Sequence, residues 1–321
     1  MPIHPALADR LPLLDGIPSF EAGFADPELR ARMDAFFLPG GHPSQPDVDV
    51  GERELDGPNG PVRVRIYTPP DLDARGRPAV VWLHGGGFRA GDLDMPEADG
   101  VARRICVAAG AVVVSVDYRL AIGGTHYPIP LDDVVAATAW VRDSAHLLGV
   151  DSGRITVGGA SAGANLAAGA ALRLRDHERS WLPALVLLAY PVLHAAIPSP
   201  QPTLAAELRQ LPRMLRFLPE DVEAITRNYL GGAPSSAPGY AMPAGAVLEG
   251  MCPVVVVNAE YDDLRPSGEA FTAALAVAGV DVRQVLVRRH LHGFLNYGFE
   301  YDEVRAALGV MADAVGQAGR R

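Results

Sequence analysis

Short apolar runs alternate with longer amphipathic stretches along most of the chain. Each apolar run is a nearly continuous series of Val, Ile and Leu, which is typical of strands buried on both faces of a parallel sheet. The intervening stretches repeat apolar positions every three or four residues, as helices do. The expected strands are residues 79–84, 111–118, 154–159, 184–190, 253–260 and 283–289, and the expected helices are residues 96–110, 132–148, 164–177 and 267–279.

A different pattern precedes this alternation. Residues 51–69, GERELDGPNGPVRVRIYTP, predict a hairpin with GPNGP at its turn. Strands that alternate with helices require right-handed crossovers and a parallel sheet. The sequence therefore predicts an α/β fold with a mostly parallel sheet of about eight strands and the antiparallel hairpin at one edge.

Two segments fall outside the alternation. The first residues carry a helical pattern, and some sixty residues follow the strand at 184–190 before the next strand begins. This insertion contains two helical patches that are divided around Pro212 and Pro219, and it lies at the carboxyl end of a strand, where α/β proteins bind ligands. We expect a cap of residues 1–45 and 195–235 over a catalytic core of residues 46–194 and 236–321.

Composition narrows the class of protein. Of the 321 residues, 49% are hydrophobic, and mean hydropathy is +0.11, so the chain can bury a large core. The net charge of −10 argues against a nucleic-acid surface and against a polybasic membrane anchor. All 28 basic residues are Arg, which excludes a P-loop lysine, a Schiff-base lysine and a Ser–Lys dyad.

The two cysteines and the first twenty residues indicate where in the cell the protein is expected. Cys106 and Cys252 stand far apart in apolar contexts, without a disulfide framework, which indicates a reducing compartment. The first twenty residues show no basic segment followed by an apolar one, so no signal peptide is expected. No apolar run approaches the length of a membrane span. We therefore expect a cytoplasmic protein.

The pentapeptide GASAG, residues 159–163, follows an expected strand and opens an expected helix. This is the G-x-S-x-G pattern of a nucleophilic serine on a sharp strand-to-helix turn. Gly159 and Gly163 supply the space for such a turn, which points the hydroxyl of Ser161 out of the sheet. Because a single match also arises by chance, the motif needs a second signal.

HGGGF, residues 84–88, supplies that signal at the end of an earlier strand. Attack on a carbonyl group creates an oxyanion, which requires preorganised N–H donors about 3 Å away. A backbone without side chains can approach that closely, although ordered glycines are costly. The expected oxyanion-hole donors are the N–H groups of Gly85, Gly86, Gly87 and Ala162.

A serine nucleophile requires a base and an acid, which follow it in the chain in this fold class. Asp262 and Asp263 end one late strand, and His290 and His292 end the last one. We prefer His292 over His290, because Gly293 frees the loop to turn the imidazole inward. Asp262 is preferred over Asp263. Of the other polar residues, Glu260 and Arg265 are expected to fix the loop locally, and His126 and His194 to be loop residues.

Together these motifs resemble a known family. HGGGF, GASAG, EYDDLRPSG and HGF, with VSVDYRLA at 114–121 and LLAYPVL at 187–193, are similar to the hormone-sensitive-lipase-like esterases, the bacterial family IV carboxylesterases of the α/β-hydrolase fold. The resemblance runs from about residue 50 to 318. It implies that Ser161 is the nucleophile, Asp262 the acid and His292 the base, that the glycine loop and Ala162 form the oxyanion hole, and that His84 is structural.

Three positions depart from the family pattern. Ala160 stands where the family has Asp before the nucleophile, and Asp263 replaces an expected Pro. After YRLA, the expected Pro-Glu-His run is replaced by IGGTHYP. These departures leave each catalytic atom in place. In the family, the segment that IGGTHYP replaces lies near the site, so this departure predicts an unusual substrate preference.

The sequence thus predicts a serine carboxylesterase for short- to medium-chain acyl esters that works through an acyl-enzyme and needs no metal or cofactor. Lactone, amide or natural-product deacylation stays open, as does a non-catalytic receptor on this fold. Three arginines of the insertion recur at helical spacing: Arg209, Arg213 and Arg216. They form either a solvated face of the cap or a site for an anionic substrate. The resemblance is compatible with a homodimer formed through the last strand.

Overall fold

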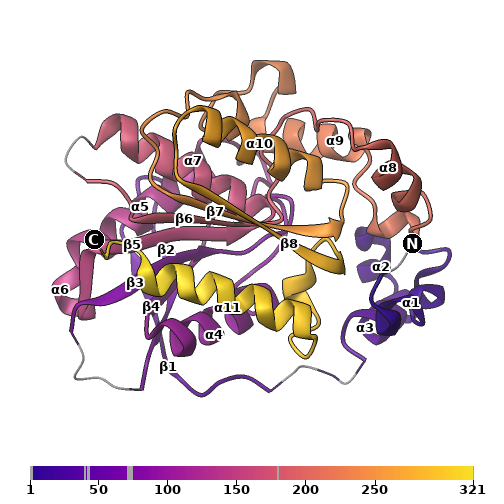
Figure 1. Cartoon of the computed structure of the whole chain (residues 1–321), viewed down its shortest axis with the longest axis horizontal. Helices are drawn as coiled ribbons and strands as arrows, with labels where there is room; N and C mark the ends of the chain where they lie inside the picture. Colours follow the sequence, from indigo (N-terminus) through magenta and orange to yellow (C-terminus); the bar gives the residue numbers. More distant parts are fainter. Residues whose placement is uncertain (1–2, 40, 42–43, 71–74, 179–180, 321) are drawn as a thin grey trace.

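The sheet organises the whole molecule. A computed structural model describes residues 3–39, 41, 44–70, 75–178 and 181–320, and eight strands form one sheet (Figure 1). They are β1 (Asp49–Leu55), β2 (Val62–Thr68), β3 (Arg77–Leu83), β4 (Val112–Asp117), β5 (Val150–Ala160), β6 (Leu185–Ala189), β7 (Val254–Tyr261) and β8 (Val282–Leu291). Their order is β1-β2-β4-β3-β5-β6-β7-β8. β2 pairs antiparallel with β1 and β4, and the other pairs are parallel, which confirms the predicted sheet.

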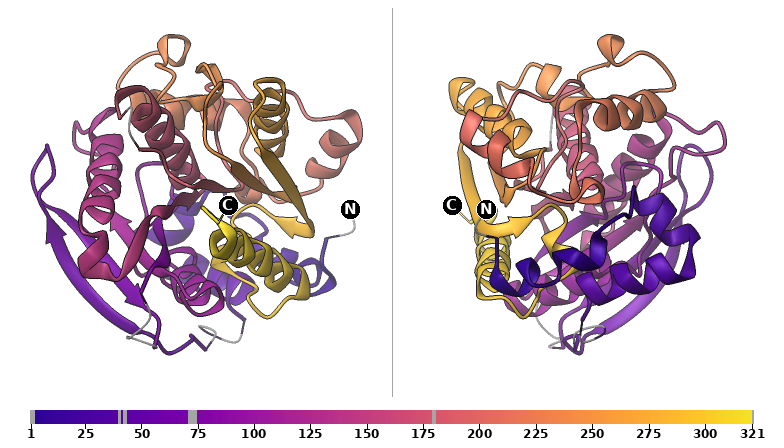
Figure 2. Two further views of the ribbon diagram at one scale, coloured as in Figure 1. Left: turned by 60° about the vertical axis from the view of Figure 1, so that its left-hand side comes forward. Right: turned by 90° about the vertical axis from the view of Figure 1, so that its right-hand side faces the viewer.

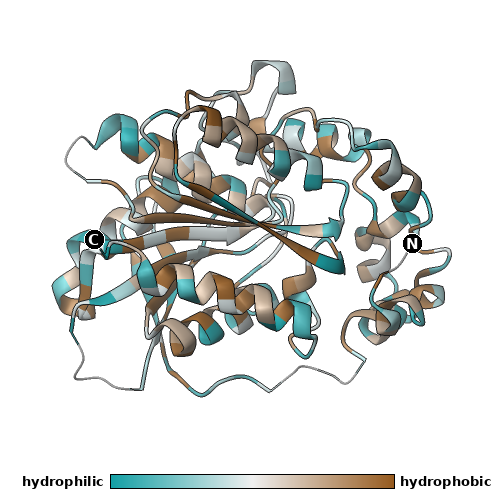
Figure 3. Cartoon of the chain, viewed as in Figure 1, coloured by the Kyte–Doolittle hydropathy of each residue, from teal (hydrophilic) through white to brown (hydrophobic). Residues whose placement is uncertain are grey.

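Helices cover both faces of the twisted sheet (Figure 2). One face carries α5 (Ile129–Asp143), α7 (Ala162–His177) and α10 (Arg265–Val277), and the other carries α4 (Val101–Ala109) and α11 (Asp302–Gln317). Successive residues of β3 alternate between the two cores: Val81 and Leu83 enter one, and Val80 and Trp82 the other. Apolar residues accordingly concentrate on the strands, whereas the helices carry both apolar and polar residues (Figure 3).

The two cores also hold both cysteines, one in each. Cys106 and Cys252 are buried free thiols, and burial raises the pKa of each to about 12. No helix in the described part of the chain combines the length and the apolar character that crossing a lipid bilayer requires.

Several element boundaries differ from the predicted ones, and three of the differences have a clear structural origin. β5 begins at Val150, earlier than expected, because Val150 pairs with Arg77 beyond an irregularity in the β3–β5 ladder. The predicted helix 132–148 is divided at Ser144 into α5 and the single turn α6 (Ala145–Leu148). The predicted helix 96–110 starts as a π-helical turn, η2 (Pro96–Gly100), before α4.

The N-terminal helices and the insertion gather at one end of the sheet, toward the viewer in the right-hand view of Figure 2. The N-terminal part contains α1 (Pro5–Ala8), η1 (Leu11–Leu14), α2 (Phe20–Ala25) and α3 (Pro27–Phe37), and the insertion contains α8 (Pro202–Leu208), η3 (Arg213–Leu215) and α9 (Pro219–Leu230). Pro212 separates α8 from η3, and Pro219 is the first residue of α9, so both prolines act as the sequence predicted.

The N-terminal segment is attached to the end of β8. His4 donates its N–H to the carbonyl of Arg289 at 2.8 Å, and the side chain of Leu7 is fully buried. The imidazole of His290 is also buried there, and its ring centroid lies 5.7 Å from that of the stacked His4 ring. Among the described residues, neither Nδ1 nor Nε2 of His290 has a hydrogen-bond partner. Burial lowers the pKa of His290 to about 4, although Glu303 at 3.8 Å opposes this shift.

We predict that this buried imidazole makes the fold acid-sensitive. In the unfolded chain, His290 binds a proton below its ordinary pKa of 6.5, whereas in the folded protein it does so only near pH 4. His290 therefore leaves the free energy of unfolding unchanged above pH 6.5. As the pH falls from 6.5 to 4, it lowers this free energy by up to about 3 kcal/mol. His290→Gln should flatten this slope in urea unfolding measured between pH 7 and pH 4. His146→Gln, at an exposed position of α6, is the matched control. An unchanged slope in His290→Gln contradicts the prediction.

Candidate active site

Ser161 occupies a strained turn between β5 and α7. Its φ of 52° and ψ of −113° lie outside the conformations that non-glycine residues ordinarily adopt. Two hydrogen bonds hold this backbone. The N–H of Ser161 donates to the carbonyl of Ala189 at the end of β6 at 2.9 Å, and its carbonyl accepts the N–H of Asn165 in α7 at 3.1 Å. The hydroxyl is thus fixed at the carboxyl end of the sheet.

Glycine at both ends of GASAG lets this turn touch the end of β3. A Cβ on Gly163 would lie 2.3 Å from the carbonyl oxygen of Leu83, and a Cβ on Gly159 would lie 2.7 Å from the same oxygen. Contacts this short are not tolerated, so any side chain at either position would push the two segments apart. A Cβ on Gly85 would lie 3.3 Å from the Cβ of Ser161. The glycine loop and the serine turn are therefore direct neighbours.

The structure brings Ser161, His292 and Asp262 together. His292 Nε2 lies 3.0 Å from Ser161 Oγ, and His292 Nδ1 lies 2.8 Å from Asp262 Oδ2. Because a carboxylate only accepts hydrogen bonds, Nδ1 carries the ring hydrogen and Nε2 accepts that of the serine hydroxyl. Asp262 is 2% exposed, and its Oδ1 accepts the N–H of Leu264 at 2.8 Å.

Aromatic rings surround the imidazole of His292. Tyr190 contacts it edge to face with ring centroids 4.9 Å apart, and Phe217, from the insertion, does so at 4.6 Å. Gly293 follows with a φ of +74°, a conformation that favours glycine. Gly293 therefore gives this loop the backbone freedom on which the preference for His292 is based.

Gly85 does not fit the role of an oxyanion donor. Its N–H donates to Oε1 of Glu97 at 2.7 Å, so this amide is directed away from a substrate oxygen. The prediction for Gly85 is therefore corrected: a buried carboxylate that the sequence does not reveal takes up its hydrogen. Gly86 and Gly87 have φ values of +110° and +60°. Within the described residues, no group accepts a hydrogen bond from the N–H of Gly86, Gly87 or Ala162.

Glu97 is a functional candidate that the sequence reasoning missed. It lies in η2, is 2% exposed, and also accepts the hydroxyl hydrogen of Tyr190 at 2.6 Å through Oε2. Burial, followed by the charge of Glu97, raises the pKa of Tyr190 well above its usual value, so the phenol remains a donor. The side-chain amide of Asn296, just after His292, accepts the N–H of Glu97 at 3.3 Å. The carboxylate of Glu97 therefore links the glycine loop to Tyr190, and the backbone N–H of Glu97 connects the same turn to the segment after His292.

His84 supports the glycine loop from inside the core. Its Nδ1 donates to the carbonyl of Gly85 at 2.7 Å, and its ring stacks on Tyr118 with centroids 4.4 Å apart. Burial lowers the pKa of His84. These contacts are structural, and they do not reach Ser161.

Asp263 faces away from the imidazole. Its carboxylate pairs with Arg216 of the insertion at 2.8 and 2.9 Å. On the same segment, Arg213 pairs with Asp221 at 2.7 Å. Neither of these guanidinium groups is a free cation for an anionic substrate.

The remaining polar candidates have local roles. Glu260 accepts the N–H of Arg289 at 2.7 Å, and Arg265 pairs with Glu269 at 2.7 Å. His126 and His194 lie in loops, as expected: the first bonds to the carbonyl of Asn228 at 2.7 Å, and the second to the hydroxyl of Ser267 at 2.8 Å. All four are separate from the Ser161–His292 contact.

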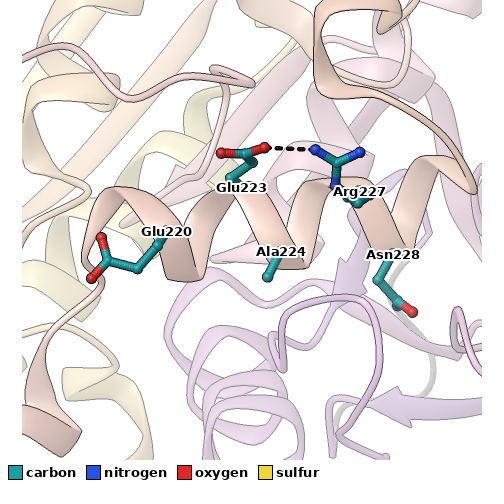
Figure 4. A pocket seen from close by; sticks show the side chains of 5 residues that line it. All are labelled: Glu220, Glu223, Ala224, Arg227 and Asn228. Atoms are coloured by element: carbon teal, nitrogen blue, oxygen red, sulfur yellow. Dashed lines mark hydrogen bonds and ion pairs between the residues drawn. The ribbon is translucent and has the colours of Figure 1, made fainter.

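A hollow of about 500 Å³ lies along α9 (Figure 4). Its lining comes from that helix alone: Glu220, Glu223, Ala224, Arg227 and Asn228. Glu223 and Arg227 pair with each other at 2.6 Å. The hollow contains none of the residues around Ser161 and is separate from the candidate site.

Known proteins are similar to this chain in sequence and in fold. A family model described as alpha/beta hydrolase fold matches residues 80–296. Esterase LipI of Mycobacterium tuberculosis is 37% identical over 297 residues, which cover 89% of this chain and 87% of LipI. Carboxylesterase NlhH of the same species is 36% identical over 306 residues, which cover 92% and 91% of the two chains.

A solved esterase structure is also similar to this chain. The hyperthermophilic esterase from the archaeon Pyrobaculum calidifontis superposes with a TM-score of 0.82 at 32% identity, and the match covers 99% of each chain. The resemblance to esterases that the motifs indicated is thereby confirmed. This chain belongs to the alpha/beta hydrolase fold family, among relatives that are esterases and carboxylesterases.

Proposed function

We propose that the protein hydrolyses carboxylic esters with Ser161 as nucleophile, His292 as base and Asp262 as the acid that orients it. The observation that carries this proposal is the continuous relay of 3.0 and 2.8 Å from Ser161 Oγ through the imidazole to the buried carboxylate. A serine hydroxyl becomes a useful nucleophile when an adjacent base takes its proton. A ligand receptor would not require such a relay.

The reaction follows from these positions. His292 Nε2 takes the hydroxyl proton as Ser161 Oγ bonds to the acyl carbon, and Asp262 stabilises the imidazolium that results. The tetrahedral intermediate collapses when the same nitrogen returns the proton to the departing alkoxide. Water then gives a proton to His292 and attacks the acyl-enzyme. The carboxylic acid leaves, and Ser161 regains its proton.

The oxyanion hole in this proposal consists of the N–H groups of Gly86, Gly87 and Ala162. Ala162 is the first residue of α7, so its N–H has no partner within the helix. The proximity of the glycine loop to Ser161 supports the same assignment. Each such donor typically contributes about 3 to 4 kcal/mol to stabilisation of the transition state.

Residues 1–45 and 195–235 form the cap in this proposal. A Cβ on Gly87 would lie 3.7 Å from Ile225 of α9, and Phe217 contacts His292. From the N-terminal part, Glu21 lies 3.7 Å from Arg89, which follows the glycine loop. The apolar side chains among these favour short- to medium-chain acyl or alcohol groups over charged ones.

Replacing the nucleophile tests the proposal directly. We expect Ser161→Ala to lower kcat/KM for p-nitrophenyl butyrate by about a thousandfold or more, because no other group can form the acyl-enzyme. Initial rates measure the effect, and an unchanged circular dichroism spectrum shows that the variant is folded. A loss of less than about a hundredfold rejects Ser161 as nucleophile.

Glu97 is predicted to position the glycine loop. Glu97→Gln should lower kcat by about tenfold to a hundredfold with little change in KM, since a misplaced loop weakens only transition-state contacts. Binding of a trifluoromethyl ketone, which mimics the tetrahedral intermediate, should weaken in parallel. Asp133→Asn is the matched control, because this buried carboxylate binds Arg119 and forms no hydrogen bond to the glycine loop or to His292. Wild-type kcat in Glu97→Gln would speak against the positioning role.

A further inference from the structure

The loop after β7 carries two adjacent carboxylates that face different partners. Asp262 bonds to His292, whereas Asp263 bonds to the insertion. We propose that the ion pair between Asp263 and Arg216 latches the cap onto this loop and holds Phe217 against His292. These three residues then position the catalytic imidazole and determine which acyl or alcohol groups fit beside it. The inference rests on the ester hydrolysis proposed above.

The latch consists of three hydrogen bonds to one carboxylate. Arg216 donates through Nε and Nη2 at 2.8 and 2.9 Å, and the N–H of Phe217 donates at 2.9 Å. The side chains of Arg216 and Asp263 are only 13% and 11% exposed. A bidentate pair of this kind is directional and is far less weakened by water than an exposed one.

The third hydrogen bond connects the latch to the reacting atoms. Because Asp263 holds the N–H of Phe217, it fixes the backbone that carries the Phe217 ring. That ring meets the imidazole of His292 edge to face at 4.6 Å, and Tyr190 from the core meets it at 4.9 Å. The imidazole is therefore held between one ring of the core and one ring of the cap. Removing the latch releases only the ring of the cap.

The other anchors of the insertion are independent of Asp263. Tyr229, at the far end of α9, stacks on Phe88 of the glycine loop with centroids 3.9 Å apart. Arg227 pairs with Glu223 on the same helix, with 56% and 58% of their side chains exposed. Loss of the latch should therefore loosen one end of the cap without detaching it. Because Arg227 pairs within α9 and not with a residue of the latch, it provides a matched control for the loss of one arginine.

The experiment compares selectivity among esters. Variants Arg216→Met, Asp263→Asn and Phe217→Ala are assayed with p-nitrophenyl acetate and octanoate. We expect the ratio of kcat/KM for acetate to that for octanoate to fall about fivefold in each, because a short acyl group depends on the Phe217 wall and a long one fills the opened space. In the Arg216→Met/Asp263→Asn double variant, this ratio should fall no further than in either single variant.

Arg227→Met should keep the wild-type ratio. Ratios within about twofold of wild type in both Arg216→Met and Asp263→Asn would overturn the latch. Hydrogen exchange of the Phe217 amide gives a readout that does not need catalysis, and we expect faster exchange in Asp263→Asn than in Arg227→Met. If wild type shows no Ser161-dependent hydrolysis, the proposed function fails on its own. Unchanged exchange in Asp263→Asn would then still refute the latch.

Discussion

The end of β3 touches the turn between β5 and α7 through backbone atoms, and the rest of the site is arranged around this contact. It exists because Gly159 and Gly163 leave no side chain between the turn and the carbonyl of Leu83. Ser161 has a positive φ in this turn, and hydrogen bonds to β6 and α7 stabilise that conformation. Two motifs that lie far apart in the sequence thereby form one surface. The glycine loop and the serine hydroxyl meet on it.

Carboxylates fix the loops that complete this surface, and each one accepts a backbone N–H. Glu97 holds Gly85, Asp262 holds Leu264, and Asp263 holds Phe217. Each carboxylate also binds a side chain, which is a phenol, an imidazole or a guanidinium group respectively. Hydrogen bonds to a charged acceptor are stronger than neutral ones, which suits loops that must stay in place during catalysis. These hydrogen bonds therefore hold the loops at the end of the sheet in fixed positions around Ser161.

Local sequence signals predicted most of the fold and the core of the site. The apolar runs located the six parallel strands, because strands buried on both faces must be continuously apolar. Serine and glycine motifs were informative because few residue types tolerate their backbone geometry. The contacts between distant side chains were not predictable: nothing in PEADG indicates that Glu97 turns inward, and the choice between Asp262 and Asp263 depended on which carboxylate faces His292. For the same reason the sequence assigned Gly85 to the oxyanion hole, whereas its amide binds Glu97.

The central claim is that the N–H groups of Gly86, Gly87 and Ala162 converge on the oxygen of a group bound to Ser161. A crystal structure of the enzyme inactivated by a p-nitrophenyl alkylphosphonate tests it most directly, because the phosphonate adduct mimics the tetrahedral intermediate. The account predicts a covalent bond to Ser161 Oγ and a phosphoryl oxygen about 3 Å from those three nitrogens. A phosphoryl oxygen directed to solvent, or an adduct on a residue other than Ser161, would contradict it.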